Sequence, residues 1–130
     1  RHARSSSHYY EGATALPAPV AGAAAKALEI VLREPQLRAR LRDNVSLLRQ
    51  GLRDLGLSVL DSPSPVIGLA AGDAGNMRRL HAELKESGIL VPYFPTYSGT
   101  GKEGLLRIAV CAAHTAGMLQ QLLGEMARIL

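Results

Sequence analysis

Arg107 is the residue of this sequence whose position best suits recognition of a charged ligand. It stands near the start of a predicted strand over 105–111, directly after a glycine-rich loop. Side chains alternate across a strand, so Arg107 shares its face with the small residues Ala109 and Cys111, which leave space for a ligand or another domain. A planar guanidinium binds a carboxylate through two parallel hydrogen bonds, as recognition of an amino acid requires. The alternative is an arginine on a solvated sheet face.

Other residue types that often carry chemistry have structural interpretations here. His114 lies between a strand and a helix without a carboxylate or cysteine partner nearby in sequence, which favours a hydrogen bond to the backbone. The other histidines show no metal-ligand spacing with one another or with Cys111, so no metal site is expected. We expect Cys111, in an apolar strand, to serve packing. The glycines of 98–104 lead into a strand and not into a helix, which favours a flexible loop over a phosphate-binding loop.

Two helices are predicted in the first half of the chain. The first covers 21–32, a run of good helix formers, and Pro35 interrupts it. Apolar residues at steps of three and four form one stripe along the second helix, and Gly56 ends it. That stripe consists of Leu37, Leu41, Val45, Leu48, Leu52 and Leu55.

Short strands and two further helices are predicted in the second half. The strands cover 58–60, 66–71, 89–93 and 105–111. Asp73 caps a helix over 76–87, and Thr115 caps the final helix. Leu106, Ile108 and Val110 share the face of the last strand opposite Arg107.

These elements predict an α/β fold, in which helices pack on one face of a small antiparallel or mixed sheet. A long helical arm precedes the sheet. Residues 1–12 show no periodicity and are expected to form an extended or poorly ordered lead-in, and 13–130 to form a single small α/β domain.

Composition narrows the classes of function. The chain has 130 residues, 47% hydrophobic and only 4% aromatic, which predicts one domain with an aliphatic core. The net charge is +4, but the arginines of 33–53 alternate with acidic residues and lack aromatic neighbours, so a solvated helix face is expected and nucleic-acid binding is not. A single cysteine and the absence of long apolar runs predict a cytoplasmic protein without membrane insertion. The sequence lacks an initiator Met, which suggests that it was cut from a longer chain.

Five segments together resemble one enzyme family in one order. They are Thr-Ala-Leu-Pro at 14–17, Ser-Pro-Val-Ile at 64–67, Gly-Asp at 72–73, Gly-Ile-Leu-Val-Pro at 88–92, and Leu-Arg-Ile-Ala-Val-Cys-Ala-Ala-His-Thr at 106–115. They resemble the carboxy-terminal small domain of the α-oxoamine synthases, fold-type-I enzymes that use pyridoxal 5'-phosphate and are related to aspartate aminotransferase. The likeness runs from about residue 10 to residue 130.

The resemblance implies roles for particular residues. Arg107 would hold the substrate carboxylate, and Thr14 would reach the cofactor phosphate of the neighbouring subunit. Residues 112–115 would begin a helix and take no catalytic part. The loop at 97–101 departs from the Val-Pro-x-Gly element that many members carry beside the acyl-substrate entrance, which leaves the acyl donor open.

The cofactor also needs a lysine for its Schiff base and an acidic partner for its ring nitrogen. None of Lys26, Lys85 and Lys102 has the family's cofactor-lysine context, so these parts are expected in a large domain upstream. We therefore expect no catalytic residue and no bound cofactor in this chain, which is inactive alone. The full-length enzyme is expected to be a homodimer.

Three functions remain open. The preferred one is the carboxy-terminal domain of an acyltransferase that condenses an amino acid with an acyl-CoA thioester and releases carbon dioxide. The second is an aminotransferase of the same fold, because the arginine serves both reactions. The third is a freestanding regulatory module that binds an amino acid through Arg107.

Overall fold

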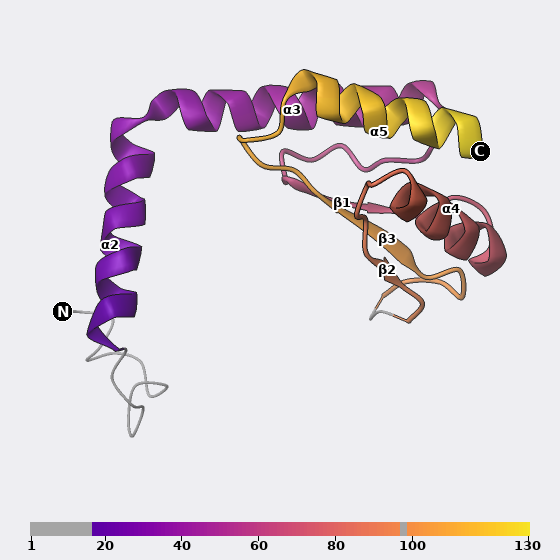
Figure 1. Ribbon diagram of the computed structural model, residues 1–130, viewed down its shortest axis with the longest axis horizontal. Coiled ribbons are helices and arrows are strands. Elements are labelled where there is room, and N and C mark those ends of the chain that lie inside the picture. The colour runs from indigo at the N-terminus through magenta and orange to yellow at the C-terminus, as the bar shows by residue number, and fades with distance from the viewer. Residues whose placement is uncertain (1–16, 97–98) are drawn as a thin grey trace. The chain divides into compact units, whose positions relative to one another are not determined.

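The computed structural model describes residues 17–96 and 99–130. The chain divides into two compact units, residues 1–35 and residues 36–130, and each is described here by itself. In chain order the elements are α2, α3, β1, α4, β2, β3 and α5 (Figure 1). The predicted lead-in at 1–12 lies outside the described residues.

The first unit contains the helix α2 (Ala18–Arg33), three residues longer at its start than predicted. Pro17 precedes it and Pro19 lies in its first turn, where a missing amide hydrogen costs nothing. Glu29 pairs with Lys26 (3.1 Å) and with Arg33 (2.7 Å) along one side. No residue of α2 is buried among the described residues, and its apolar side chains, including Leu28 and Leu32, are exposed.

The long helix α3 (Pro35–Asp54) belongs to the second unit from Gln36 onward. Proline fits the first position of a helix, so Pro35 starts a new helix where the previous one ends. The predicted apolar stripe is confirmed, since Val45, Leu48 and Leu52 are buried. Gly56 ends the helix with a φ of 78°, as predicted.

The sheet has three antiparallel strands in the order β1-β3-β2. They are β1 (Val66–Leu69), β2 (Tyr93–Phe94) and β3 (Leu105–Ala109). Ile67 pairs with Ile108 and Leu69 with Leu106, and all four side chains are buried. The predicted fold class, an α/β unit with a small antiparallel sheet, is confirmed.

Two strand predictions were wrong. Residues 58–60 form no strand; instead, Arg49 of α3 donates hydrogen bonds to the carbonyls of Leu60 and Ser64 and holds this segment without a neighbouring strand. The strand predicted at 89–93 shrinks to Tyr93–Phe94. The reason is that Pro92 has no amide hydrogen for a ladder and that His81 Nδ1 contacts the carbonyl of Val91 (2.7 Å).

Both predicted helix caps are confirmed. The Asp73 carboxylate accepts hydrogen bonds from the amides of Gly75 (2.8 Å) and Asn76 (2.9 Å) at the start of α4 (Ala74–Glu86). These bonds hold the pKa of Asp73 below its ordinary value. The Thr115 hydroxyl accepts from the amide of Met118 (3.2 Å) at the start of α5 (Ala116–Ile129).

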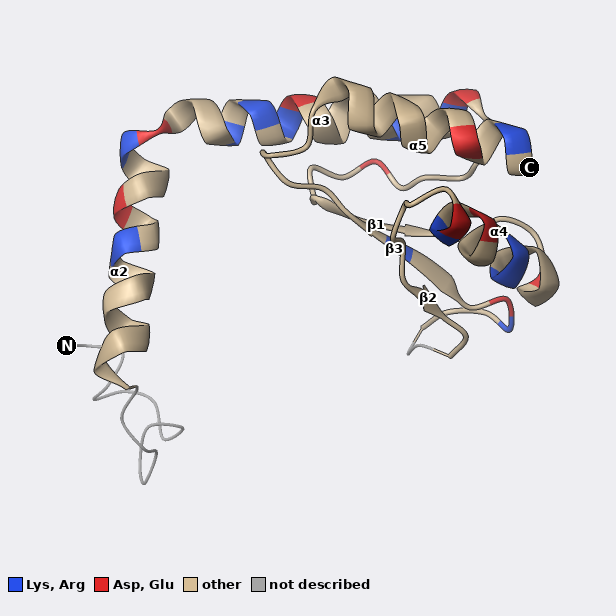
Figure 2. Cartoon of the chain, in the orientation of Figure 1, with Lys and Arg blue, Asp and Glu red and all other residues tan. Residues whose placement is uncertain are grey.

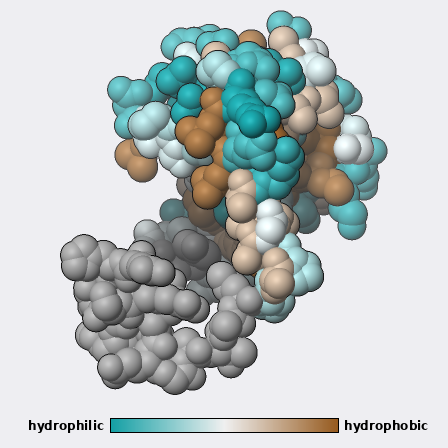
Figure 3. All heavy atoms as spheres, turned by 90° about the vertical axis from the view of Figure 1, so that its left-hand side faces the viewer, coloured by the Kyte–Doolittle hydropathy of each residue, from teal (hydrophilic) through white to brown (hydrophobic). Residues whose placement is uncertain are grey.

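The core of the second unit is aliphatic, as the scarcity of aromatic residues predicts. Its fully buried side chains are Leu48, Leu52, Ile67, Leu69, Met77, Leu80, Leu84, Leu106 and Met126. On the face drawn in Figure 3, hydrophilic side chains cover much of the visible surface, with smaller hydrophobic areas between them. Among the described residues, no helix is long and apolar enough to cross a membrane.

Candidate functional site

Arg107 lies in the central strand of the sheet, on the face opposite the core. Its flanking residues Leu106 and Ile108 are buried, whereas Arg107 and Ala109 are exposed, so the predicted alternation is confirmed. The amide of Arg107 donates to the carbonyl of Pro92 (2.9 Å), which extends the β2 edge by one bond. The strand therefore fixes the backbone position of Arg107, and its side chain extends from the open face of the sheet.

The guanidinium of Arg107 has no hydrogen bond or ion pair with any of residues 17–96 or 99–130. Its five N–H donors are thus available to an outside acceptor. The residue directly across the strand pair is Gly68 of β1, which adds no side chain beside the arginine. An exposed, unpaired arginine beside a glycine is an arrangement that can accept a planar carboxylate.

Gly68 is needed at this position for a steric reason. A Cβ atom placed on it would lie 2.9 Å from Cδ1 of Leu105, which leans over the glycine from the neighbouring strand. A larger residue at 68 would displace Leu105 or fill the space next to Arg107. The sequence offered no signal for this pairing, because it depends on the strand register.

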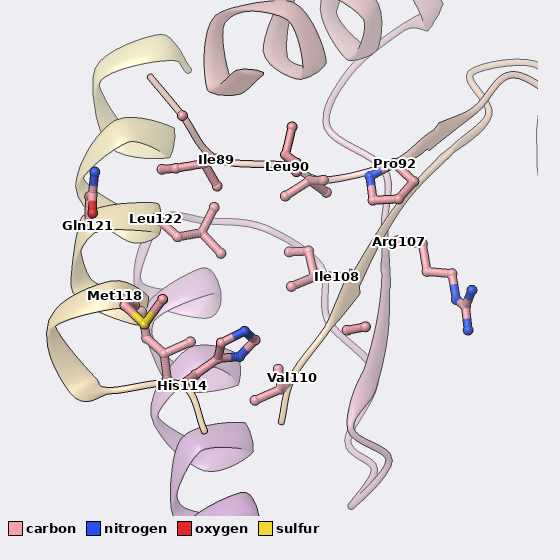
Figure 4. Close-up of a pocket in the computed structure, with 14 residues that line it drawn as sticks. Ile89, Leu90, Pro92, Arg107, Ile108, Val110, His114, Met118, Gln121 and Leu122 are labelled. Carbon is pink, nitrogen blue, oxygen red and sulfur yellow. The ribbon is translucent and has the colours of Figure 1, made fainter. Parts of the chain in front are cut away.

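An apolar cavity of about 320 Å³ lies beside β3. Its lining includes Ile89, Leu90, Val110 and Met118 (Figure 4). The backbone near Arg107 borders this cavity, but the side chain of Arg107 points away from the labelled apolar residues. His114 lies on the cavity side and also lines this cavity, whereas the Arg107 side chain extends away from it.

His114 has the structural role that the sequence predicts. The amide of Cys111 donates to His114 Nδ1 (3.2 Å), which closes the turn between β3 and α5. Two side chains of α3 also bind this turn: Asn44 donates to the carbonyls of Cys111 and His114, and Arg40 donates to that of Ala112 (2.6 Å). These contacts from α3 were not foreseen, because they join residues about 70 positions apart.

The interpretation of Cys111 as a packing residue is wrong. The strand ends at Ala109 and the chain turns, so Cys111 leaves the apolar layer and is exposed. The loop before β3 is held by a hydrogen bond from the Tyr93 hydroxyl to the carbonyl of Glu103 (2.8 Å). No group of three potential metal ligands occurs within the described residues.

The three lysines among the described residues all lie on the surface. Lys26 pairs with Glu29 on the surface of α2, and Lys85 and Lys102 are exposed. None of the three lines the cavity beside β3. Thr14, which the family resemblance places near the cofactor phosphate, lies outside the described residues.

Comparison with known proteins gives a consistent result. The family model of the aminotransferases of class I and II matches residues 2–126. An 8-amino-7-oxononanoate synthase of Thioalkalivibrio sulfidiphilus is 38% identical over 95% of this chain and 31% of its own length. Two solved structures also match: 8-amino-7-oxononanoate synthase of Francisella tularensis (27% identity, TM-score 0.76) and serine palmitoyltransferase of Sphingomonas wittichii (28% identity, TM-score 0.81).

The two structures are matched over 88% and 97% of this chain but over only 33% and 32% of their own lengths. The chain thus spans about a third of the proteins that it resembles. These matches confirm the resemblance to a fold-type-I, α-oxoamine synthase-like small domain that the ordered motifs indicated. With a family model covering nearly its whole length, this chain belongs to the aminotransferases of class I and II.

Proposed function

We propose that residues 13–130 are the small domain of a pyridoxal-phosphate-dependent acyltransferase, in which Arg107 binds the carboxylate of the amino-acid substrate. The observation that carries this proposal is the unpaired guanidinium of Arg107 on the open face of β3, directly across from Gly68. Relatives that bear the names 8-amino-7-oxononanoate synthase and serine palmitoyltransferase support the acyl-transfer class.

The rest of the polypeptide supplies the cofactor site in this proposal. The three lysines described above have no cofactor pocket, so the Schiff-base lysine and its acidic partner belong to the remaining two thirds of the protein. Pyridoxal phosphate acts as an electron sink for a substrate carbanion. Thr14 binds the phosphate of the cofactor that the second subunit of a homodimer holds.

Arg107 performs binding and orientation. A bidentate contact fixes both the position and the plane of a carboxylate, which directs the substrate's α-carbon in one direction. Because the sheet face around Arg107 is open in this chain, another part of the full protein must cover it to exclude water. The contact gains strength as that cover lowers the local dielectric.

The reaction type is tested with the full-length protein. An acyltransferase releases carbon dioxide from a carboxyl-labelled amino acid only when an acyl-CoA is added, and free CoA appears in equal amount. Transfer of the amino group to a 2-oxo acid without an acyl-CoA would replace the proposal by the aminotransferase alternative. Saturable binding of an amino acid to the 130-residue chain without cofactor would favour the regulatory module.

A further inference from the structure

A second pocket, of about 340 Å³, lies between α3 and the segment that follows it. Its α3 side is lined by Arg42, Ser46, Arg49 and Arg53. Steps of four, three and four residues bring these side chains to one face of the helix. Asp61 and Ser62 line the opposite side. The arginines expected to form a solvated helix face thus converge, in part, on one cavity.

Arg49 is a buried cation in the wall of this pocket. It is 5% exposed, and its two terminal nitrogens donate to the carbonyls of Leu60 (2.5 Å) and Ser64 (3.0 Å). Its Nε–H is buried without an acceptor among the described residues. No carboxylate of the described chain pairs with Arg49. A buried charge without a counter-charge is costly, and an anion in the pocket would offset part of that cost.

The charge of the pocket lining is also unbalanced. Three arginines and one aspartate give +3 and −1, a net charge of +2. Asp61 contacts Arg53 at 3.3 Å, but its side chain is fully exposed, so water screens most of its effect. Arg42 has no ion pair within residues 17–96 and 99–130. Basic residues recur along α3 in Figure 2.

We propose that this pocket binds a small phosphate-bearing anion, as inorganic phosphate or as the ester of a small molecule. A phosphate monoester carries a charge of roughly −1.5 to −2 at neutral pH and three acceptor oxygens, which matches the net charge of the lining. Arg42 and Arg53 contact the oxygens directly. Arg49 contributes its unneutralised charge from within the wall.

Two hydroxyl groups complete the set of donors. Ser46 is exposed on α3 beside the arginines. The Ser62 hydroxyl already accepts a hydrogen bond from the amide of Ser64 (3.1 Å), so its own hydrogen is free for a ligand oxygen. The pocket shares no lining residue with the cavity beside β3, and the proposal therefore stands independently of the role of Arg107.

The test is a titration of the 130-residue chain, followed by nitrogen-15 NMR of the backbone and of arginine Nε–H groups. The ligands are inorganic phosphate, glycerol phosphate and acetate, at constant ionic strength. We expect saturable shifts at Ser46, Ser62 and Arg49 Nε–H with both phosphates and much weaker shifts with acetate. Tighter binding of glycerol phosphate would identify an ester as the ligand, and equal or weaker binding would identify free phosphate.

Three variants separate a site from a general charge effect. Arg42→Gln with Arg53→Gln removes the direct contacts and should weaken phosphate binding about tenfold or more. Arg38→Gln with Arg78→Gln is the matched control, since it removes the same charge from exposed positions outside the pocket and should change the dissociation constant less than twofold. Asp61→Asn should strengthen binding, because it removes the negative charge of the lining.

The proposal is overturned by any of three results. These are the absence of saturable shifts, equal weakening by the control pair, and acetate binding as tight as phosphate binding. Far-UV circular dichroism of each variant checks that the helices remain. The exposed positions of Arg42 and Arg53 make a loss of folding an unexpected result, and the Asp61→Asn variant provides a gain of affinity that unfolding cannot imitate.

Discussion

Replacement of Arg107 by alanine in the full-length protein tests the proposed substrate contact most directly. The side chain is exposed and has no partner among residues 17–96 and 99–130, so its removal leaves no hole in the core. Surface substitutions of this kind change the free energy of unfolding by within about 0.5 kcal/mol. Any large effect on substrate binding is therefore separable from an effect on folding.

The expected loss of affinity follows from the degree of burial. Removing one partner of a hydrogen-bonded charge pair costs roughly 2 to 5 kcal/mol when the pair is desolvated. Arg107 lies on an open face in this chain, and any cover must come from elsewhere, so the lower end of that range applies. About 2 kcal/mol corresponds to roughly thirtyfold weaker binding of the amino acid.

The assay is a titration with amino acid, monitored by the absorbance of the bound cofactor. The spectrum of the Arg107→Ala variant without substrate should match that of the parent, because the arginine contacts the substrate and not the cofactor. The amino-acid-dependent change should move to about thirtyfold higher concentration. Arg107→Lys should restore part of the affinity, since an ammonium group supplies charge without the planar fork.

The matched control is Arg38→Ala, which removes an exposed arginine from α3. It should bind amino acid as the parent does. If Arg107→Ala also titrates like the parent, Arg107 is a surface residue and the proposed role is wrong. If the variant loses its cofactor spectrum before substrate is added, the arginine supports the cofactor site instead.

Three further changes test the geometry around the site and the fold. Gly68→Val places branched carbons where Leu105 now lies, 2.9 Å from the position of a Cβ, and should weaken amino-acid binding in the same titration; unchanged affinity would contradict the close packing. Asp73→Ala removes the cap of α4 and should lower the melting temperature at pH 7. Because the folded pKa of Asp73 lies below its unfolded value, the cap's contribution is present above the unfolded pKa and is lost as the pH falls through the folded one. The difference in melting temperature from the parent should therefore shrink in acid, and a constant difference would refute the cap's ionic character. Leu48→Ala empties a fully buried position and should lower the free energy of unfolding by about 2 to 5 kcal/mol in a urea titration, whereas a loss below 1 kcal/mol would place Leu48 outside the core.

Local sequence rules were sufficient wherever one helix or strand determined the outcome. The spacing of Val45, Leu48 and Leu52 revealed the buried face of α3, and the caps at Asp73 and Thr115 follow from side-chain chemistry within four residues. The alternation in β3 placed Arg107 on the open face, which is the part of the candidate site that the sequence could provide.

Features that depend on distant partners were missed. The segment 58–60 has strand-forming residues but no neighbour to pair with, and the bonds from Arg49 determine its course. Alternation along the predicted strand places Cys111 on the same face as Arg107, but the strand ends at Ala109 and Cys111 lies in the turn that follows. The pairing of Gly68 with Arg107 requires the register of two strands separated by about 40 residues, which no local pattern encodes.

The bonds from Arg40 and Asn44 to the turn after β3 have a consequence for the order in which the chain folds. They close loops of 72 and 67 residues, and the chain loses conformational entropy on closing such a loop before the bonds can form. Contacts of this length slow folding, whereas the helical turns of α3 form locally. The turn that starts α5 therefore acquires its full set of bonds only after α3 has docked, late in folding. The turn that leads into α5 is thus held in place by Arg40 and Asn44, which are synthesised about 70 residues earlier.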